Sequence, residues 1–125
     1  MKFEFYGENM KIWIDDIRPA PPGYTWIKNV NSAKEWITIF ETRANGLKEL
    51  ISKNPNSKIV IPTIEVVDID HDAGEYASDG GDYIKLLDWL EETNRNYPIR
   101  IHSMNPVGIE NMRRIIQKNG WKEIK

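Results

Sequence analysis

Acidic and polar side chains gather at three separate points of this 125-residue sequence, each directly after a short apolar run. The three groups are Asp15 and Asp16; Asp70, His71 and Asp72; and His102, Ser103 and Asn105. Carboxylates brought close together repel, which raises the pKa of at least one of them unless a cation lies between them. An oxygen-rich cluster suits Mg²⁺, which prefers carboxylates and water. We therefore predict Asp15, Asp16 and Asp70 as metal ligands, with Mg²⁺ or another divalent cation as cofactor.

Each acid taken alone has an ordinary explanation. Asp15 and Asp16 would merely begin a polar turn, and Asp72 would merely cap a loop. The set as a whole favours a functional site, because buried unpaired acids are costly. Asp68 precedes Asp70 by two residues and points to the same side of a strand, and three interpretations stay open. It is an acid that supports the ligands, a hydrogen-bonded structural group, or a sign that the strand ends earlier.

Both histidines of the chain fall at predicted strand ends, His71 directly after Asp70 and His102 directly before Ser103. Imidazole titrates near neutrality and can exchange a proton with a leaving oxygen. We predict His102, His71 and Asp70 as the catalytic residues. The alternative for each histidine is a packing or capping role, which is the more common one for an isolated histidine.

Several further polar residues could hold an anion near these strand ends. An arginine guanidinium clamps phosphate, a hydroxyl donates to it, and the free N–H groups at the start of a helix attract it. The residues that we predict to contact phosphate or substrate are Arg18, Asp72, Ser103, Asn105 and Asn111. Simple exposure to solvent is the alternative for the arginine and for Asn111.

The elements that must position these side chains alternate between strand and helix. Apolar, β-branched runs predict strands at 11–16, 24–30, 63–70 and 98–103, with a last edge strand at 121–125. Residues 3–6 either extend the first of these or form a separate short strand. Helical spacing predicts a helix from Asn31 or Ser32 to about 47, where Gly46 bends or stops it, a second over 83–90 capped by Asp82, and a third after Asn105. The same spacing places Trp36 in the core and Val107 on the inward face of the third helix. A Pro-rich stretch at 17–23 excludes a helix after the first strand. Strand–helix alternation indicates an α/β fold with a mainly parallel sheet, whose carboxyl ends share one edge.

Composition excludes several classes of protein. The hydrophobic fraction of 40% and the charged fraction of 29% are typical of a globular domain rather than a disordered chain. The formal net charge of -2 gives no basic field that would attract DNA, and the absence of cysteine excludes thiolate metal sites. No run is long enough to cross a bilayer or to form a signal peptide. We therefore expect one domain over residues 1–125, located in the cytoplasm, with no membrane partner.

Three segments in combination resemble a known family. KIWIDDIRPAP, VVDIDHDAG and IRIHSMNPVGIENM are similar to the cyclic-phosphate processing receiver domains, small relatives of response-regulator receivers, and the likeness spans Lys11 to about Trp121. The resemblance implies a receiver-like (flavodoxin-like) three-layer fold with a mainly parallel sheet of order 2-1-3-4-5, in which the Pro-rich loop replaces the first helix. It matches Asp15 and Asp16 to a metal-binding acidic pair, Asp70 to the phosphoacceptor position and Ser103 to the hydroxyl residue after the fourth strand.

The function that the resemblance implies is phosphoester processing of cyclic phosphates of nucleotide or RNA origin. The implied partner is a small phosphorylated or cyclic-phosphate ligand, or an RNA end. No strand clearly supplies the phosphate-contacting lysine of receivers, for which Lys122 and Lys125 are weak candidates, and histidines flank the site instead. This difference favours phosphoester chemistry over storage of a phosphoryl group. The alternative is a degenerate receiver that accepts phosphate on Asp70, senses a nucleotide or docks a partner protein.

Overall fold

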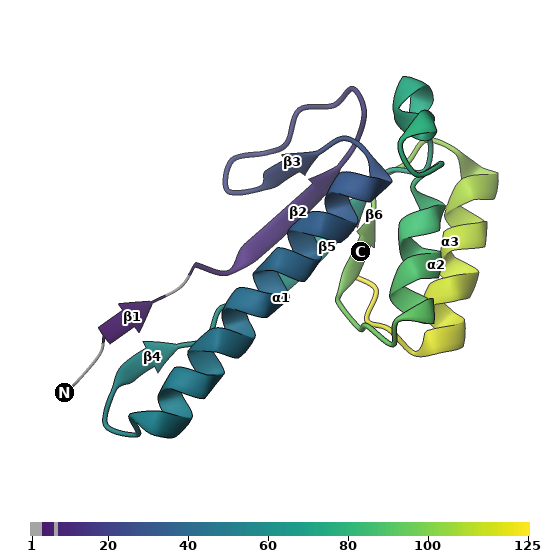
Figure 1. Ribbon diagram of the computed structural model, residues 1–125. Coiled ribbons are helices and arrows are strands. Elements are labelled where there is room, and N and C mark those ends of the chain that lie inside the picture. Colours follow the sequence, from purple (N-terminus) through teal and green to yellow (C-terminus); the bar gives the residue numbers. More distant parts are fainter. Residues whose placement is uncertain (1–3, 7) are drawn as a thin grey trace.

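Four parallel strands form the central sheet of the computed structural model, which describes residues 4–6 and 8–125 (Figure 1). In spatial order they are β3 (Thr25–Ile27), β2 (Met10–Ile14), β5 (Ile64–Ile69) and β6 (Ile99–Ile101). The last segment of the chain continues this sheet, because Glu123 bridges Ile99 of β6 in a parallel sense. The resulting order is the predicted 2-1-3-4-5, with the terminal strand reduced to a single bridge.

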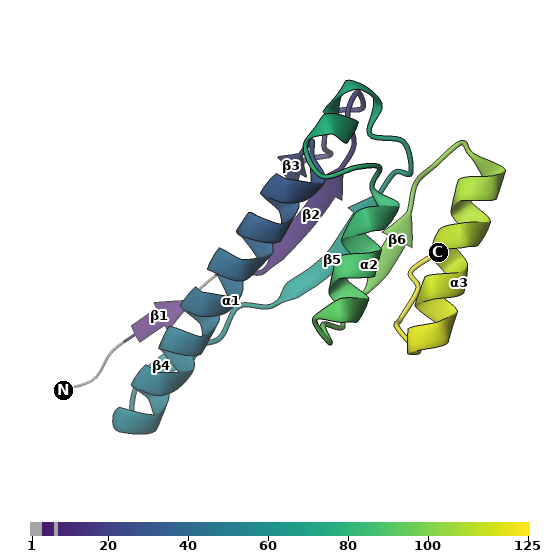
Figure 2. The same cartoon turned by 45° about the vertical axis from the view of Figure 1, so that its right-hand side comes forward.

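Three α-helices cover one face of this sheet (Figure 2). They are α1 (Val30–Lys53), α2 (Ile84–Glu92) and α3 (Pro106–Asn119), and a short 3-10 helix, η1 (Gly74–Ser78), precedes α2. Side chains alternate along a strand, so Ile12, Val67 and Ile99 point to the same face and lie fully buried in one core with residues from all three helices. Burial of this apolar face stabilises the fold.

The opposite face of the sheet is covered by the Pro-rich loop rather than by a helix. Trp13 points to this face and is 8% exposed. Its indole Nε1–H donates to the carbonyl of Arg18 at 2.8 Å, and its ring meets that of Tyr24 edge-on with centroids 5.8 Å apart. The loop over residues 17–24 therefore forms a thin third layer in the place of the first helix, as the sequence predicts.

Helix α1 differs from the prediction at both of its ends. It begins at Val30, because the Asn29 side chain, rather than Asn31 or Ser32, caps it by accepting from the Ser32 N–H at 2.7 Å. It neither stops at Gly46 nor divides there but runs on to Lys53. A glycine costs a helix only about 1 kcal/mol, and the two leucines, two lysines and one glutamate that follow it in α1 are strong helix formers.

Three other local predictions were wrong. Asp82 does not cap α2, because its carboxylate accepts from the Ala73 N–H at 3.1 Å and thereby ties down the loop after β5. Val107, expected to face inward, is 69% exposed because it lies in the first turn of α3, where the helix meets the loop edge. Trp36, expected in the core, is 48% exposed on α1.

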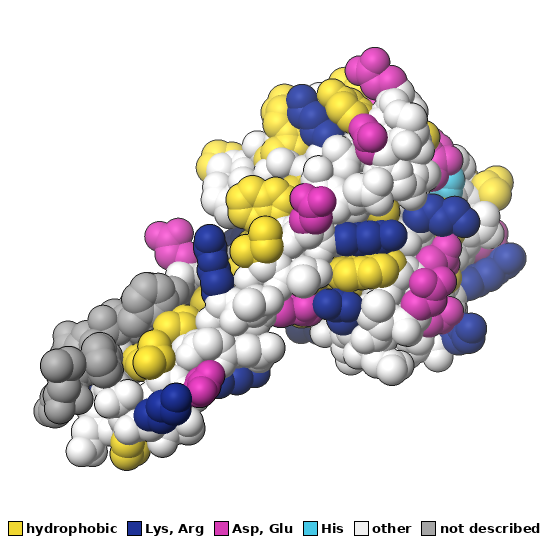
Figure 3. Space-filling view, viewed as in Figure 1, with side chains coloured by type: hydrophobic (Ala, Val, Ile, Leu, Met, Phe, Trp, Pro, Cys, Tyr) yellow, Lys and Arg dark blue, Asp and Glu magenta, His cyan; other side chains and the backbone are white. Residues whose placement is uncertain are grey.

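The second half of α1 extends beyond the central sheet (Figures 1 and 2). Beside it lie β1 (Glu4–Tyr6) and β4 (Lys58–Val60), which pair in parallel as a separate two-stranded sheet. Of the possible strand at 3–6, residue 3 lies outside the described residues. Basic and acidic side chains are intermixed over the helical face (Figure 3), in keeping with the small net charge. Among the described residues, no helix has the length and apolar character needed to span a membrane.

Candidate functional site

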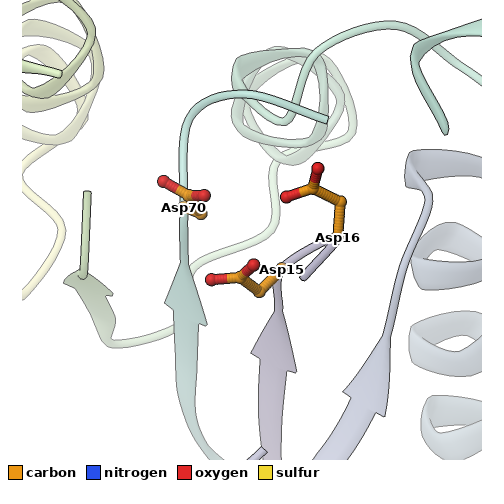
Figure 4. Close-up of side chains that lie close together, drawn as sticks. All are labelled: Asp15, Asp16 and Asp70. Carbon is orange, nitrogen blue, oxygen red and sulfur yellow. The ribbon is translucent and has the colours of Figure 1, made fainter. Parts of the chain in front are cut away.

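Three carboxylates meet at the carboxyl edge of the sheet (Figure 4). Asp15 and Asp16 directly follow β2, and Asp70 directly follows the neighbouring strand β5. The Asp70 N–H donates to the carbonyl of Ile14 at 2.9 Å, so the two strand ends are held side by side. One oxygen atom from each carboxylate lies within 4.8 Å of the other two. Parallel neighbouring strands thus bring the three predicted metal ligands together.

The cluster is electrostatically unfavourable for Asp16. Burial and then the negative charges of Asp15 and Asp70 raise the pKa of the Asp16 carboxyl above its ordinary value. A cation among the three oxygens would relieve this repulsion, and hard carboxylate oxygens are the donors that Mg²⁺ selects. The donor set therefore fits a divalent cation.

Asp15 is 1% exposed and yet held ionised by its hydrogen bonds. Burial opposes ionisation, but the N–H groups of Arg18 and Ile17, each 2.9 Å from Oδ1, together with His102, outweigh it and hold the pKa of Asp15 below its ordinary value. The loop after β2 thus stabilises the charged form of a buried acid, which is the form that a cation would need.

Glycine is required where the loop after β5 passes the cluster. Gly74 has a φ of 56°, in the left-handed region that favours glycine, and a Cβ atom there would lie 2.5 Å from Oδ2 of Asp16. The DHDAG sequence therefore allows the backbone to approach the carboxylate closely.

His102 bridges two buried carboxylates. Its Nε2 lies 3.0 Å from Asp15 Oδ2, and its Nδ1 lies 2.6 Å from Asp68 Oδ1. Only 7% of its side chain is exposed, so both ring nitrogens are engaged inside the protein. Asp68 is fully buried within β5, and its second oxygen accepts from Arg100 at 3.1 Å. Of the three interpretations of Asp68, a misplaced strand end is therefore excluded, and the other two describe the same hydrogen-bonded group.

His71 directly follows Asp70 in the chain and has a free ring nitrogen. Its Nδ1 is 2.9 Å from Oδ1 of Asp72, and its side chain is 16% exposed. The ring rests on Gly108 of α3, where a Cβ atom would overlap it. Among the described residues, no side chain or backbone group hydrogen-bonds to Nε2. His71 can therefore exchange a proton with a ligand, whereas His102 faces only protein groups.

The residues predicted to contact phosphate are distributed around the edge. Ser103 Oγ accepts from the Asn105 N–H at 3.1 Å, which leaves its hydroxyl hydrogen available. Asn105 caps α3 by accepting from the Gly108 N–H at 3.0 Å, so only its amide –NH₂ remains. Arg18 contributes backbone groups to the site, and the side chains of Arg18 and Asn111 are exposed without a described contact to the carboxylates. Asp72 is occupied by His71.

Sequence reasoning did not assign Trp13 or Arg100 to the site. Each lies on a strand, two residues before a site residue that directly follows that strand: Trp13 precedes Asp15, and Arg100 precedes His102. Because side chains alternate along a strand, this spacing places each on the same face as its site neighbour. The period-of-two pattern could have identified them.

This combination of fold and site defines a receiver-like α/β protein. The parallel sheet has the order 2-1-3-4-5, in which β2 is strand 1 and β5 is strand 3. The acidic cluster lies at the carboxyl ends of these two strands. The sequence model of the cyclic-phosphate processing receiver domain family matches residues 10–118, and the chain belongs to this family. No curated protein and no solved structure shows significant similarity to the chain.

Proposed function

We propose that this protein is a metal-dependent phosphoester-processing enzyme that acts on cyclic phosphates of nucleotide or RNA origin. One observation carries the proposal: three carboxylates at the sheet edge lie within 4.8 Å of one another, and the residue after Asp70 is a histidine with a free ring nitrogen. The family's description, which links these domains to cyclic-phosphate processing, supports the choice of substrate.

The carboxylates of Asp15, Asp16 and Asp70 would hold a divalent cation. Such a cation polarises a phosphoryl oxygen and lowers the pKa of a bound water. The chain keeps Asp15 ionised through the loop N–H groups and places Asp70 at the more open side of the cluster, since its side chain is only partly buried. The negative charge of the three acids would otherwise repel a phosphate, so substrate binding depends on the cation.

His71 is the residue that we assign to proton transfer. Asp72 accepts from Nδ1, which leaves the lone pair of Nε2 free to take a proton from the attacking water. As the new P–O bond forms, the bond between phosphorus and one ribose oxygen breaks, and that oxygen takes the proton back from the imidazole. The products are a phosphomonoester and a free hydroxyl. His102 has both nitrogens engaged, so we assign it an orienting role instead.

Three groups are placed to bind the phosphate oxygens in this proposal. They are the hydroxyl of Ser103, the amide –NH₂ of Asn105 and, after movement of an exposed side chain, the guanidinium of Arg18. Positively charged and N–H donors stabilise the charge that develops on these oxygens in the transition state. Asn111 lies one turn further along α3 and would contact the remainder of a larger ligand, such as an RNA end.

The test is hydrolysis of 2',3'-cyclic nucleotides followed by chromatography, with and without Mg²⁺. Wild-type protein should release a phosphomonoester only with the cation. Asp70→Asn and His71→Ala should each lower kcat by a factor of about 10² or more. Glu92→Gln, which alters an exposed acid at the far end of α2, should behave as wild type. No product from the wild type under either condition contradicts the proposal.

A second candidate is a phosphoacceptor, as in signalling receivers. One observation favours it: within the described part of the chain, the partly buried Asp70 side chain accepts a single hydrogen bond, at Oδ1, from the adjacent His71 N–H at 2.8 Å. Its Oδ2 is therefore available as a nucleophile. Incubation with acetyl phosphate and Mg²⁺ separates the two functions, because a base-labile mass increase on Asp70 indicates signalling, whereas turnover without an adduct indicates the enzyme.

A further inference from the structure

The fully buried carboxylate of Asp68 takes no part in the proposed reaction. A buried charge is costly unless it is paired and hydrogen-bonded, so its position inside β5 requires an explanation. We propose that Asp68 is a positioning residue: it acts through His102 to fix the orientation of the Asp15 carboxylate. The proposal rests on the proposed function only in taking Asp15 to be a cation ligand.

Two short distances place the ring of His102 between two carboxylates. Nδ1 is 2.6 Å from Asp68 Oδ1, and Nε2 is 3.0 Å from Asp15 Oδ2. Each ring nitrogen therefore contacts one carboxylate, and His102 links the inside of the sheet to its edge.

The ring of His102 is held in place by a second aromatic ring. It is stacked on the indole of Trp13 with centroids 3.7 Å apart and planes 5° apart. Trp13 is in turn fixed by its hydrogen bond to the Arg18 carbonyl at 2.8 Å. Arg100 takes the second oxygen of Asp68, which leaves the first oxygen to His102. Arg100 thus fixes one oxygen of the Asp68 carboxylate, and the other oxygen orients the ring of His102.

The consequence for Asp15 follows from the lone pairs of a carboxylate, which number about four. Two hydrogen bonds from loop N–H groups use Oδ1, and His102 uses one position on Oδ2. One position remains for a cation. Without Asp68, the cluster keeps its ligands, but the Asp15 oxygen that faces His102 loses its alignment.

Calorimetric titration with Mg²⁺ tests the proposal independently of turnover. Asp68→Asn should bind Mg²⁺ about 10- to 100-fold more weakly than the wild type, the usual effect of removing a partner of a metal ligand. Glu65→Gln is the matched control, because it removes one exposed acid from the same strand, and it should leave the affinity unchanged. Equal affinity of Asp68→Asn and wild type overturns the proposal.

A double-mutant cycle separates positioning from a merely structural role. Because Asp68 acts through His102, Asp68→Asn should cost almost no further Mg²⁺ affinity in a His102→Gln background. If the two substitutions weaken Mg²⁺ binding independently, their fold-losses in affinity multiply in the double variant. That result would contradict the proposal that Asp68 acts through His102. A Glu65→Gln variant combined with His102→Gln provides the corresponding baseline.

The ring nitrogens of His102 give a second readout in the wild type, so the test survives if a variant fails to fold. In nitrogen-15 NMR, Mg²⁺ should shift the signals of both ring nitrogens of His102, because one contacts Asp15 and the other Asp68. Ring signals that stay unchanged at saturating Mg²⁺ overturn the proposal. If Asp68→Asn weakens Mg²⁺ binding but the wild type hydrolyses no cyclic phosphate, the proposed function fails and the role of Asp68 stands. If the wild type hydrolyses cyclic phosphates and Asp68→Asn binds Mg²⁺ as tightly as the wild type, the proposed function stands and the role of Asp68 fails.

Discussion

The imidazole ring of His102 lies flat against the indole ring of Trp13, with centroids 3.7 Å apart. These residues belong to β2 and to the loop after β6, and β5 runs between the two strands. In the register of the sheet, Asp68 of β5 is the direct neighbour of Trp13. The stacked pair therefore closes over Asp68, which explains how a carboxylate on the face without helices becomes fully buried.

Replacement of Trp13 should destabilise the fold as well as the site. Trp13→Ala removes a large buried ring, the hydrogen bond to the Arg18 carbonyl and the support of His102. We expect a loss of about 3–5 kcal/mol in the free energy of unfolding, measured by denaturant titration. Trp36→Ala is the control, because that ring is 48% exposed, and it should cost about 1 kcal/mol or less. Equal losses would contradict the assignment of Trp13 as the cover of this face.

Two glycines in helices should respond to alanine in opposite directions. A Cβ atom at Gly108 would overlap the ring of His71, whereas one at Gly46 would meet nothing within 4 Å. Gly46→Ala should therefore stabilise the protein by about 0.5–1 kcal/mol. Gly108→Ala should destabilise it by about 1–3 kcal/mol, because the His71 ring must move. Denaturant unfolding measures both, and a stabilised Gly108→Ala variant would show that His71 does not rest on α3.

Asp16 should lower the stability of the metal-free fold while it contributes to cation binding. Its raised pKa means that the folded protein binds the Asp16 proton more tightly than the unfolded chain. Stability is therefore lost as pH rises through that raised pKa, and the full cost is present at pH values above it. Asp16→Asn should raise the melting temperature without metal and abolish the further rise caused by Mg²⁺. Thermal melts at neutral pH check this, with Glu92→Gln as the control; a lower melting temperature of metal-free Asp16→Asn contradicts it.

The salt bridge between Glu41 and Arg95, outside the candidate site, should account for part of the loss of stability at low pH. Burial opposes ionisation of Glu41, but hydrogen bonds from Arg95 and Tyr97 outweigh it and lower the pKa of Glu41 below its ordinary value of 4.5. This contribution to stability is complete above that ordinary value and is lost as pH falls through the lowered pKa.

Glu41→Gln should therefore cost about 1.5–3 kcal/mol at pH 7, since it weakens hydrogen bonds to a charged group. It should also flatten the fall in stability below pH 4.5. Glu49→Gln, which breaks an exposed pair with Lys53, should change the unfolding free energy by about 0.5 kcal/mol or less. Parallel pH profiles of Glu41→Gln and wild type would rule out this role of Glu41.

The order of elements and the meeting of Asp15 with Asp70 could be predicted, because both follow from local patterns and from the rule that parallel strands share a carboxyl edge. Each acid directly follows a β-branched run, and this position alone predicts that it lies at the carboxyl end of a strand. The Pro-rich loop was likewise recognisable, since proline excludes a helix after the first strand.

The partners of His102 could not be predicted from the sequence. Its contacts with Trp13, Asp68 and Asp15 depend on the register of three strands, which no local pattern determines. The two histidines look alike in the sequence, each beside a polar strand end, and only tertiary packing shows that the free ring nitrogen belongs to His71. Exposure of Trp36 and Val107 was missed for a similar reason, because helical spacing alone does not tell where a helix leaves the sheet.

Calorimetric titration of the wild type and of Asp70→Asn with Mg²⁺ tests the central claim most directly. If the three carboxylates form one cation site, the wild type should bind one Mg²⁺ per chain, and Asp70→Asn should bind at least about tenfold more weakly. Absence of binding to the wild type, or equal affinity of the two proteins, would show that the acids at this edge do not act together.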